Sequence, residues 1–344
     1  MDCLEGMKKI PDNSIDSCVT DPPYGLSKEP DIREVLEKWL NNEPYDHKHA
    51  GFMGKTWDSF VPHPDIWREV YRVLKPGAHA LVFAGTRTQD LMTISLRLAG
   101  FEVRDVIEWL YFSGFPKSMD VSKAFDKRAG VEREVIGKGN AGLAKGESRR
   151  NGSHIVGYRE TYDITAPATE LAKKWDGWGT ALKPAHEPII VVRKPLIGTV
   201  AENVERWGTG AINVDGCRID YTDDQDRKQN TEGLSRFLGT SGGWKNTSIN
   251  GVAPSGKSIK GRWPANIVTT EPDAFWSKYC NVTPPELSKK ASKRDRNSDW
   301  RGEEITLPER VAGGLKGRAD GSLGKQTFNR NTHPTCKPTD LMAW

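Results

Sequence analysis

The chain has 344 residues, of which 36% are hydrophobic and 28% are charged, and its 50 lysines and arginines against 46 aspartates and glutamates leave a net charge of +4. Mean hydropathy is -0.63, and no stretch approaches the roughly 20 apolar residues of a membrane-spanning helix, which excludes a transmembrane protein. The charge balance permits a nucleic-acid partner without requiring one. A polar start (MDCLEGMKKIPDNS) and five scattered cysteines without a C-x-x-C pair indicate a reducing, cytoplasmic setting.

Short apolar runs alternate with helical patterns through the first half of the chain. Strands are predicted at IDSCVT (15–20, buried), AHALVFAG (78–85, buried), FEVRDVIEWLYF (101–112) and EPIIVVRKP (187–195). Helices are predicted at DIWREVYRVLKPG (65–77), where a Pro-Gly pair ends the helix, and at TQDLMTISLRLAG (88–100), which a glycine ends. This alternation predicts an open α/β sheet.

The region between residues 198 and 324 has a different composition and a weaker apolar periodicity. It holds half of the 34 glycines, and its apolar periods are short and interrupted. Such a composition indicates a loop-rich insert.

The tetrapeptide Asp21-Pro22-Pro23-Tyr24 directly follows the first predicted strand. In open α/β sheets, ligands bind beyond the carboxyl ends of strands, where this tetrapeptide is expected. The prolines fix φ and lack N–H donors, the Asp21 carboxylate accepts hydrogen bonds, and the Tyr24 ring offers a face for stacking a base. Together these groups suit the exocyclic amine of a purine or pyrimidine. The alternative interpretation is a plain strand-terminating turn.

DPPY after a short strand resembles motif IV of the amino-group DNA methyltransferases, which have a Rossmann-like class I methyltransferase fold. Further blocks are similar to bacterial and phage members: NSIDSCVTDPPYG, YRVLKPGAHALVFAG, GFPKSMDVSKA, GTALKPAHEPIIVVRKP, GRWPANIV and HPTCKP. The catalytic block comes first and HPTCKP last, as in the β group, where recognition sequences lie between them. The resemblance thus implies site-specific DNA modification, either linked to restriction or protecting a phage.

The resemblance implies direct methyl transfer from S-adenosylmethionine to the amino group of a base flipped out of double-stranded DNA. Its implied catalytic residues are Asp21, Pro22, Pro23 and Tyr24, without a metal. Asp21 at the first position of the motif favours adenine-N6 as the target. A cytosine-N4 methyltransferase and an inactive DNA-binding remnant are the alternatives.

The resemblance also assigns the cofactor block. HPTCKP is expected to open a helix near the methionine end of the cofactor, and a helix start with a threonine and a lysine suits a carboxylate. A proline-rich helix start without a ligand is the alternative. The implied cofactor residues are His333, Pro334, Thr335 and Lys337, together with Asp2 near the start of the chain.

Basic side chains outside the motifs are candidates for contact with DNA phosphates. They are Lys117, Lys183, Lys289, Lys290 and Arg294, and solvated loop residues are the alternative interpretation of each. His47 and His49 are expected on an exposed loop rather than in a metal site.

The glycine-rich loop that the β group has after HPTCKP is missing from this sequence, and GTGAIN (208–213) is rejected as its equivalent because no clear strand precedes it. We therefore expect a truncated enzyme that does not bind the cofactor or turn over on its own, with three parts. These are the catalytic half of the sheet (1–197), a target-recognition insert (198–330) and the start of the cofactor block (331–344). A half-sheet alone would leave an exposed edge at the strand 15–20.

Overall fold

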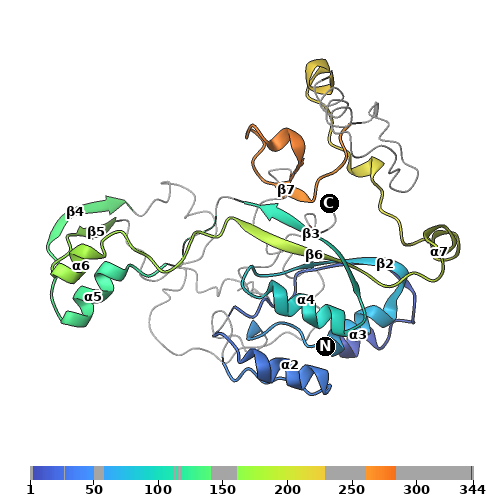
Figure 1. Ribbon diagram of the computed structural model, residues 1–344, viewed down its shortest axis with the longest axis horizontal. Helices are drawn as coiled ribbons and strands as arrows, with labels where there is room; N and C mark the ends of the chain where they lie inside the picture. Colours follow the sequence, from blue (N-terminus) through green and yellow to red (C-terminus); the bar gives the residue numbers. More distant parts are fainter. Residues whose placement is uncertain are drawn as a thin grey trace, which may run out of the picture. The chain divides into compact units, whose positions relative to one another are not determined.

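The computed structural model describes residues 3–26, 28–49, 58–111, 114, 116, 118–140, 161–228, 261–283 and 342. These residues belong to two compact units (Figure 1). The first consists of Met1–Tyr111 and His186–Trp344, and the second of Phe112–Ala185. Within the described ranges, no helix is long and apolar enough to cross a membrane.

The first unit is built on a six-stranded sheet with the order β1-β2-β6-β3-β7-β8. Its strands are β1 (Ile15–Thr20), β2 (Leu74–Phe83), β6 (His186–Arg193), β3 (Glu102–Leu110), β7 (Ile267–Thr269) and β8 (Asn281–Val282). β6 runs antiparallel to both of its neighbours, whereas β1 is parallel to β2, and β7 is parallel to β3 and to β8. The prediction of an open α/β sheet is confirmed.

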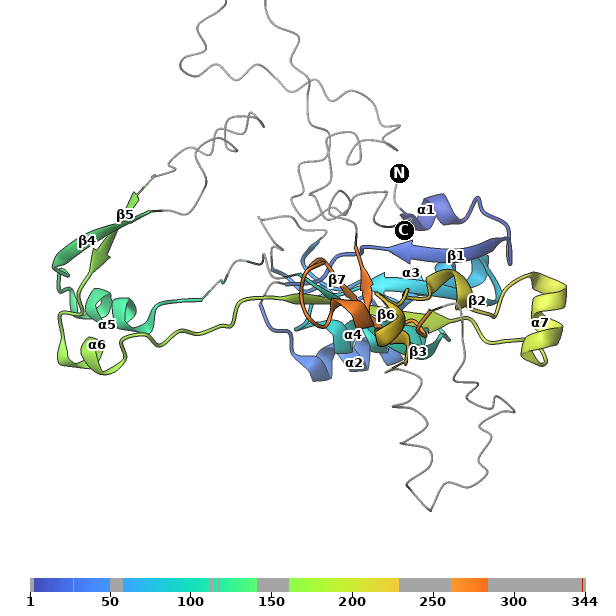
Figure 2. The same cartoon turned by 90° about the horizontal axis from the view of Figure 1, so that it is seen from above.

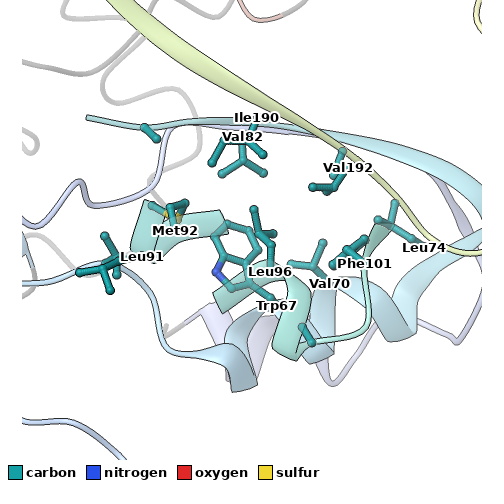
Figure 3. Close-up of a cluster of buried hydrophobic side chains, with 14 of the residues drawn as sticks. Trp67, Val70, Leu74, Val82, Leu91, Met92, Leu96, Phe101, Ile190 and Val192 are labelled. Carbon is teal, nitrogen blue, oxygen red and sulfur yellow. The ribbon is translucent and has the colours of Figure 1, made fainter. Parts of the chain in front are cut away.

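Helices α3 (Pro64–Val73) and α4 (Gln89–Leu98) lie on one face of this sheet, and α2 (Ile32–Leu40) packs against α4 (Figure 1). Their buried side chains, among them Trp39, Trp67 and Leu96, form one cluster with alternate residues of β2 and β6 such as Val82 and Ile190. Figure 3 shows this cluster between the helices and the strands. Burying a large apolar side chain contributes about 1.5–3 kcal/mol, so this face is the main stabilising contact of the unit.

Helix ends follow local chemistry. The α2 helix begins where the Asp31 carboxylate accepts the backbone N–H of Arg33 at 2.9 Å, and α3 begins with Pro64 after the His63 ring nitrogen, which accepts the N–H of Asp65 at 3.2 Å. Gly100 follows α4 with a φ of +104°, a conformation that side chains with a Cβ rarely adopt. The predicted helix over 88–100 therefore ends at its predicted glycine.

Two details differ from the sequence prediction. The strand at 15–20 is present as β1, but it lies at the edge of the described sheet and is not buried, since Val19 is 40% exposed. The helix expected to end at Pro-Gly ends earlier, at Val73, because the chain from Leu74 already pairs with β1. Pro76 and Gly77 lie where the register of that pairing shifts.

Lys194, directly after β6, is a buried cation that closes the end of α3. Its Nζ donates to the carbonyls of Tyr71 and Leu74, each at 2.8 Å, and to Asn13 Oδ1 at 2.7 Å. The first two acceptors are backbone groups that a helix end leaves unpaired, and a cation suits the negative end of the helix dipole. Burial lowers the pKa of Lys194, opposed by the charge of Asp12.

The second unit contains α5 (Val121–Ala129), β4 (Val135–Asn140), β5 (Thr161–Thr165) and α6 (Glu170–Lys174). β4 and β5 form an antiparallel pair, and α5 and α6 lie side by side next to it (Figure 2). The buried Asp126 carboxylate joins the two helices, because it accepts the backbone N–H groups of Ala168 and Thr169 at 3.0 and 2.9 Å and pairs with Arg133 at 3.3 Å. The sequence predicts these residues as part of the catalytic half (1–197), without a boundary of their own.

The described part of the insert is less irregular than its composition predicted. It contains α7 (Val200–Trp207), the 3₁₀ turns η3 (Asp215–Cys217) and η5 (Ser277–Tyr279), and the strands β7 and β8, which extend the main sheet. A buried ion pair between Arg262 and Asp226 ties its two segments together, and Arg262 also lies over the rings of Tyr221 and Tyr279. GTGAIN follows a helix, because Gly208 caps α7 with a φ of +73°.

We predict that Lys194→Met lowers the free energy of unfolding by about 2–4 kcal/mol, because it leaves buried carbonyls without a donor. Urea unfolding followed by circular dichroism measures this change. Lys75→Met is the matched control, since Lys75 pairs at 2.5 Å with Asp16, a largely exposed partner, and such pairs contribute less than about 1 kcal/mol. Equal losses in the two variants would contradict the role given to Lys194.

We also predict an acid-sensitive insert. The hydrogen bond from Arg262 lowers the pKa of Asp226 from 3.8 to about 2, against the opposing effect of burial. Because the pKa of Asp226 is lower in the folded state, its ionised carboxylate stabilises that state. The stabilisation is fully present above pH 3.8 and is lost as the pH falls toward 2. Hydrogen exchange should therefore show amides of residues 218–228 and 261–283 losing protection in that range. Asp226→Asn should show weak protection throughout, without the step.

Candidate functional site

The carboxyl edge of the main sheet brings several predicted and unpredicted polar groups together. β1, β2 and β3 end at this edge, and β6, which runs the other way, begins there. Asp21, Pro22, Pro23 and Tyr24 follow β1 without a gap, and all four are half-buried. The structure thus places the tetrapeptide where an open α/β sheet presents its ligand sites.

The Tyr24 hydroxyl lies between two carboxylates. It is 2.7 Å from Oδ1 of Asp21 and 2.8 Å from Oε2 of Glu187, the second residue of β6. Burial and the negative charges of Asp21 and Glu187 raise the pKa of Tyr24 well above its ordinary value of 10. The hydroxyl is therefore a hydrogen-bond donor, not a base, at neutral pH.

The backbone of the tetrapeptide is held by a second segment. The Thr88 hydroxyl donates to the Tyr24 carbonyl at 2.6 Å, although Thr88 stands at the N-cap position of α4 and makes no side-chain cap there. Gly25 has a φ of +64°, and a Cβ at this position would lie 2.8 Å from the backbone nitrogen of Val61. Only glycine fits there without displacing the chain.

A largely aromatic cluster packs against Tyr24. Phe83, Trp109 and Ile189 form a buried cluster at the ends of β2, β3 and β6, and the Tyr24 ring packs against it. Tyr111 belongs to the same group, and burial together with Glu187 raises its pKa to about 12. Met342, four residues beyond HPTCKP, also packs against this cluster.

Most of the other predicted site residues lie outside the described residues. These are Asp2, Lys117, Lys289, Lys290, Arg294, His333, Pro334, Thr335 and Lys337. Lys183 is described and exposed, and it belongs to the second unit. The predicted contacts of these residues with cofactor and DNA therefore stay predictions.

The histidine prediction is wrong in one part. His49 is exposed as expected, but His47 is buried, because its ring stacks on Phe60 at 5.1 Å and its Nδ1 lies 3.2 Å from the Tyr45 hydroxyl. Burial lowers the pKa of His47, so its neutral form is favoured. Among the residues that the structure describes, no group of three or more His, Cys, Asp or Glu side chains is arranged to hold a metal ion.

Glu187 is the site residue that sequence reasoning missed. It stands at the start of a predicted strand, within the quoted block GTALKPAHEPIIVVRKP. The missing information was the direction of that strand, since only an antiparallel β6 brings its first residues to the edge where β1 ends.

The acidic and aromatic loop beyond β1 lies where open α/β sheets bind their ligands. A family profile described as DNA methylase, of the N6/N4 type, matches residues 15–343. The chain belongs to the N6/N4 DNA methylase family.

Individual relatives are distant. The type II methyltransferase M.HindIII of Haemophilus influenzae is 24% identical over 234 residues, and the match covers 62% of this chain and 63% of that protein. A putative DNA modification methylase of Thermus thermophilus is similar at 14% identity, over 83% of this chain and 88% of that one, with a TM-score of 0.28. The M1.HpyAVI–SAM complex has 12% identity, 57% and 51% coverage, and a TM-score of 0.25.

We predict that Tyr24 stays protonated at pH 10, where an exposed tyrosine, with a pKa of about 10, is half ionised. Ultraviolet difference titration of the protein against Tyr24→Phe isolates this one hydroxyl. Asp21→Asn removes a negative charge and should shift the titration to lower pH. An unchanged midpoint in Asp21→Asn would contradict the contact between the two side chains.

Proposed function

We propose that this protein transfers a methyl group from S-adenosylmethionine to the N6 amino group of adenine in double-stranded DNA. The observation that carries the proposal is the half-buried Asp21–Tyr24 pair, held by a hydrogen bond at the carboxyl edge of the sheet. Membership of the N6/N4 DNA methylase family supports it. The choice of adenine over cytosine rests on Asp21 as the first residue of the motif.

The chemical difficulty is that the amino nitrogen of adenine is a weak nucleophile, because its lone pair is delocalised into the ring. Hydrogen bonds from its two N–H groups to the Asp21 carboxylate and the Pro22 carbonyl would draw the nitrogen toward a tetrahedral geometry. The lone pair would then point away from the ring plane. The contribution of these residues is therefore mainly orientation, which accounts for large rate effects when the geometry is fixed in advance.

An amine inside a duplex cannot reach these acceptors, so the target base must leave the stack. The Tyr24 ring is the surface proposed to stack on the flipped base, at roughly 1–3 kcal/mol per base. The contacts of its hydroxyl and carbonyl with Asp21, Glu187 and Thr88 support this role, since they hold the ring before any ligand arrives.

S-adenosylmethionine supplies an electrophilic methyl group on a sulfonium. Two of the similar solved structures are named as complexes with this compound, which supports it as the methyl donor. We propose His333, Pro334, Thr335 and Lys337 as its binding residues, with Asp2 near it. Met342, just beyond them in the chain, packs against the Phe83–Trp109–Ile189 cluster beside Tyr24, which supports a donor site next to the acceptor site.

The chain spans less than two thirds of the length of M.HindIII. Its biological role is therefore also a proposal. We propose site-specific DNA modification of the restriction-linked kind, with residues 198–330 contributing to target recognition. Lys117, Lys183, Lys289, Lys290 and Arg294 are the proposed phosphate contacts, which predicts salt-sensitive DNA binding.

The decisive experiment measures methyl transfer from labelled S-adenosylmethionine to DNA by the full-length enzyme, followed by mass spectrometry of the nucleosides. We expect N6-methyladenine, with Asp21→Ala reducing the rate at least about 100-fold while DNA binding survives. Asp16→Ala, a change of the same residue type on β1 itself, should leave the rate unchanged. N4-methylcytosine would overturn the choice of base, and DNA binding without any methyl transfer would overturn the enzymatic proposal.

A further inference from the structure

Glu187 is positioned at the site by a strand of the main sheet, not by a loop. It pairs with Trp109 of β3 in the β3–β6 register, and the following residue, Pro188, accepts the N–H of Ala84 at 3.0 Å. The backbone of this segment is thus held from both sides. The Glu187 carboxylate lies 2.8 Å from the hydroxyl of Tyr24, a residue 163 positions away in the chain.

A phenol hydroxyl carries one proton, whereas Asp21 and Glu187 both lie within hydrogen-bond distance of it. Ionised carboxylates only accept hydrogen bonds, so the hydroxyl donates to one of the two at a time. Rotation about the Cζ–O bond of Tyr24 exchanges the acceptor without moving the ring. The two carboxylates are therefore alternative acceptors for one proton, which stays on Tyr24 throughout.

This alternation matters because Asp21 has a second task in the proposed reaction. While the Tyr24 proton points at Asp21 Oδ1, it withdraws electron density from the carboxylate and makes it a weaker acceptor for the target amine. If Asp21 were the sole acceptor, freeing it would leave a largely buried hydroxyl unsatisfied, at a cost of about 1–3 kcal/mol. A second carboxylate at hydrogen-bond distance removes that cost.

We infer that Glu187 is a positioning residue that takes over the Tyr24 hydrogen bond when the target amine binds Asp21. The inference rests on the proposed function, since it assigns Asp21 to the amine. Glu187 itself does not contact the substrate. It fixes the Tyr24 ring from the side of β6 and keeps the Asp21 carboxylate available as an acceptor.

The test is a double-mutant cycle on methyl transfer to DNA. Glu187→Gln leaves Asp21 as the one ionised acceptor of the pair, and hydrogen bonds to charged groups are the stronger ones, so the Tyr24 proton remains on Asp21. We expect kcat to fall about tenfold, with KM for DNA nearly unchanged, because the Tyr24 hydroxyl then competes with the target amine for the Asp21 carboxylate. In Tyr24→Phe, no proton has to be relocated, so adding Glu187→Gln should cause no further loss.

The matched control is Glu102→Gln. Glu102 also links β3 with β6, through a 2.7 Å ion pair with Arg193 at the opposite end of the same strand pair, and its loss should leave kcat unchanged. Equal thermal unfolding midpoints for the Glu187 variants exclude a folding defect. If the effects of Glu187→Gln and Tyr24→Phe simply add, Glu187 acts independently of Tyr24 and the inference is wrong. If the unaltered protein transfers no methyl group, the proposed function itself fails.

Discussion

The reversed direction of β6 is the constraint on which both the core and the site depend. Residues 189–192 are buried between β2 and β3, and their alternate side chains complete the cores on the two faces of the sheet. Because β6 runs against its neighbours, it ends where they begin and begins where they end. Lys194, directly after the end of β6, therefore lies at the end of α3, and Glu187, near the start of β6, lies beside Tyr24. A register slip of one residue would exchange the two faces and displace both groups.

The tetrapeptide loop is held by contacts from three separate parts of the chain. β6 provides Glu187 for the Tyr24 hydroxyl, the segment before α4 provides Thr88 for its carbonyl, and the backbone at Val61 lies against Gly25. Two prolines limit the remaining freedom of the loop. Sites that must orient a weak nucleophile need this kind of support, since a displacement of about 1 Å can cost two orders of magnitude in rate.

Patterns that depend on neighbouring residues could be predicted from the sequence, whereas long-range contacts could not. The periodicity located β1, β2, β3 and β6 together with α3 and α4, and the Asp21–Tyr24 loop was expected at the end of its strand. Strand direction is not encoded in an apolar run, so Glu187 was missed. Lys194 follows β6 as an ordinary charged residue, and its burial depends on helix carbonyls 120 and 123 residues away. The exposure of β1 likewise depends on the order of strands, not on their composition.

The position of residues 112–185 in the chain has a further consequence. They are inserted between β3 and β6, which are paired neighbours, and Leu110 lies opposite His186. The whole second unit is therefore the connection of a long β3–β6 hairpin. The chain leaves the main sheet and returns to it at neighbouring residues. Closing such a connection costs only about 0.6 kcal/mol more for each doubling of its length. A change in the length of this unit therefore has little effect on the free energy of the strand pairing beside the site.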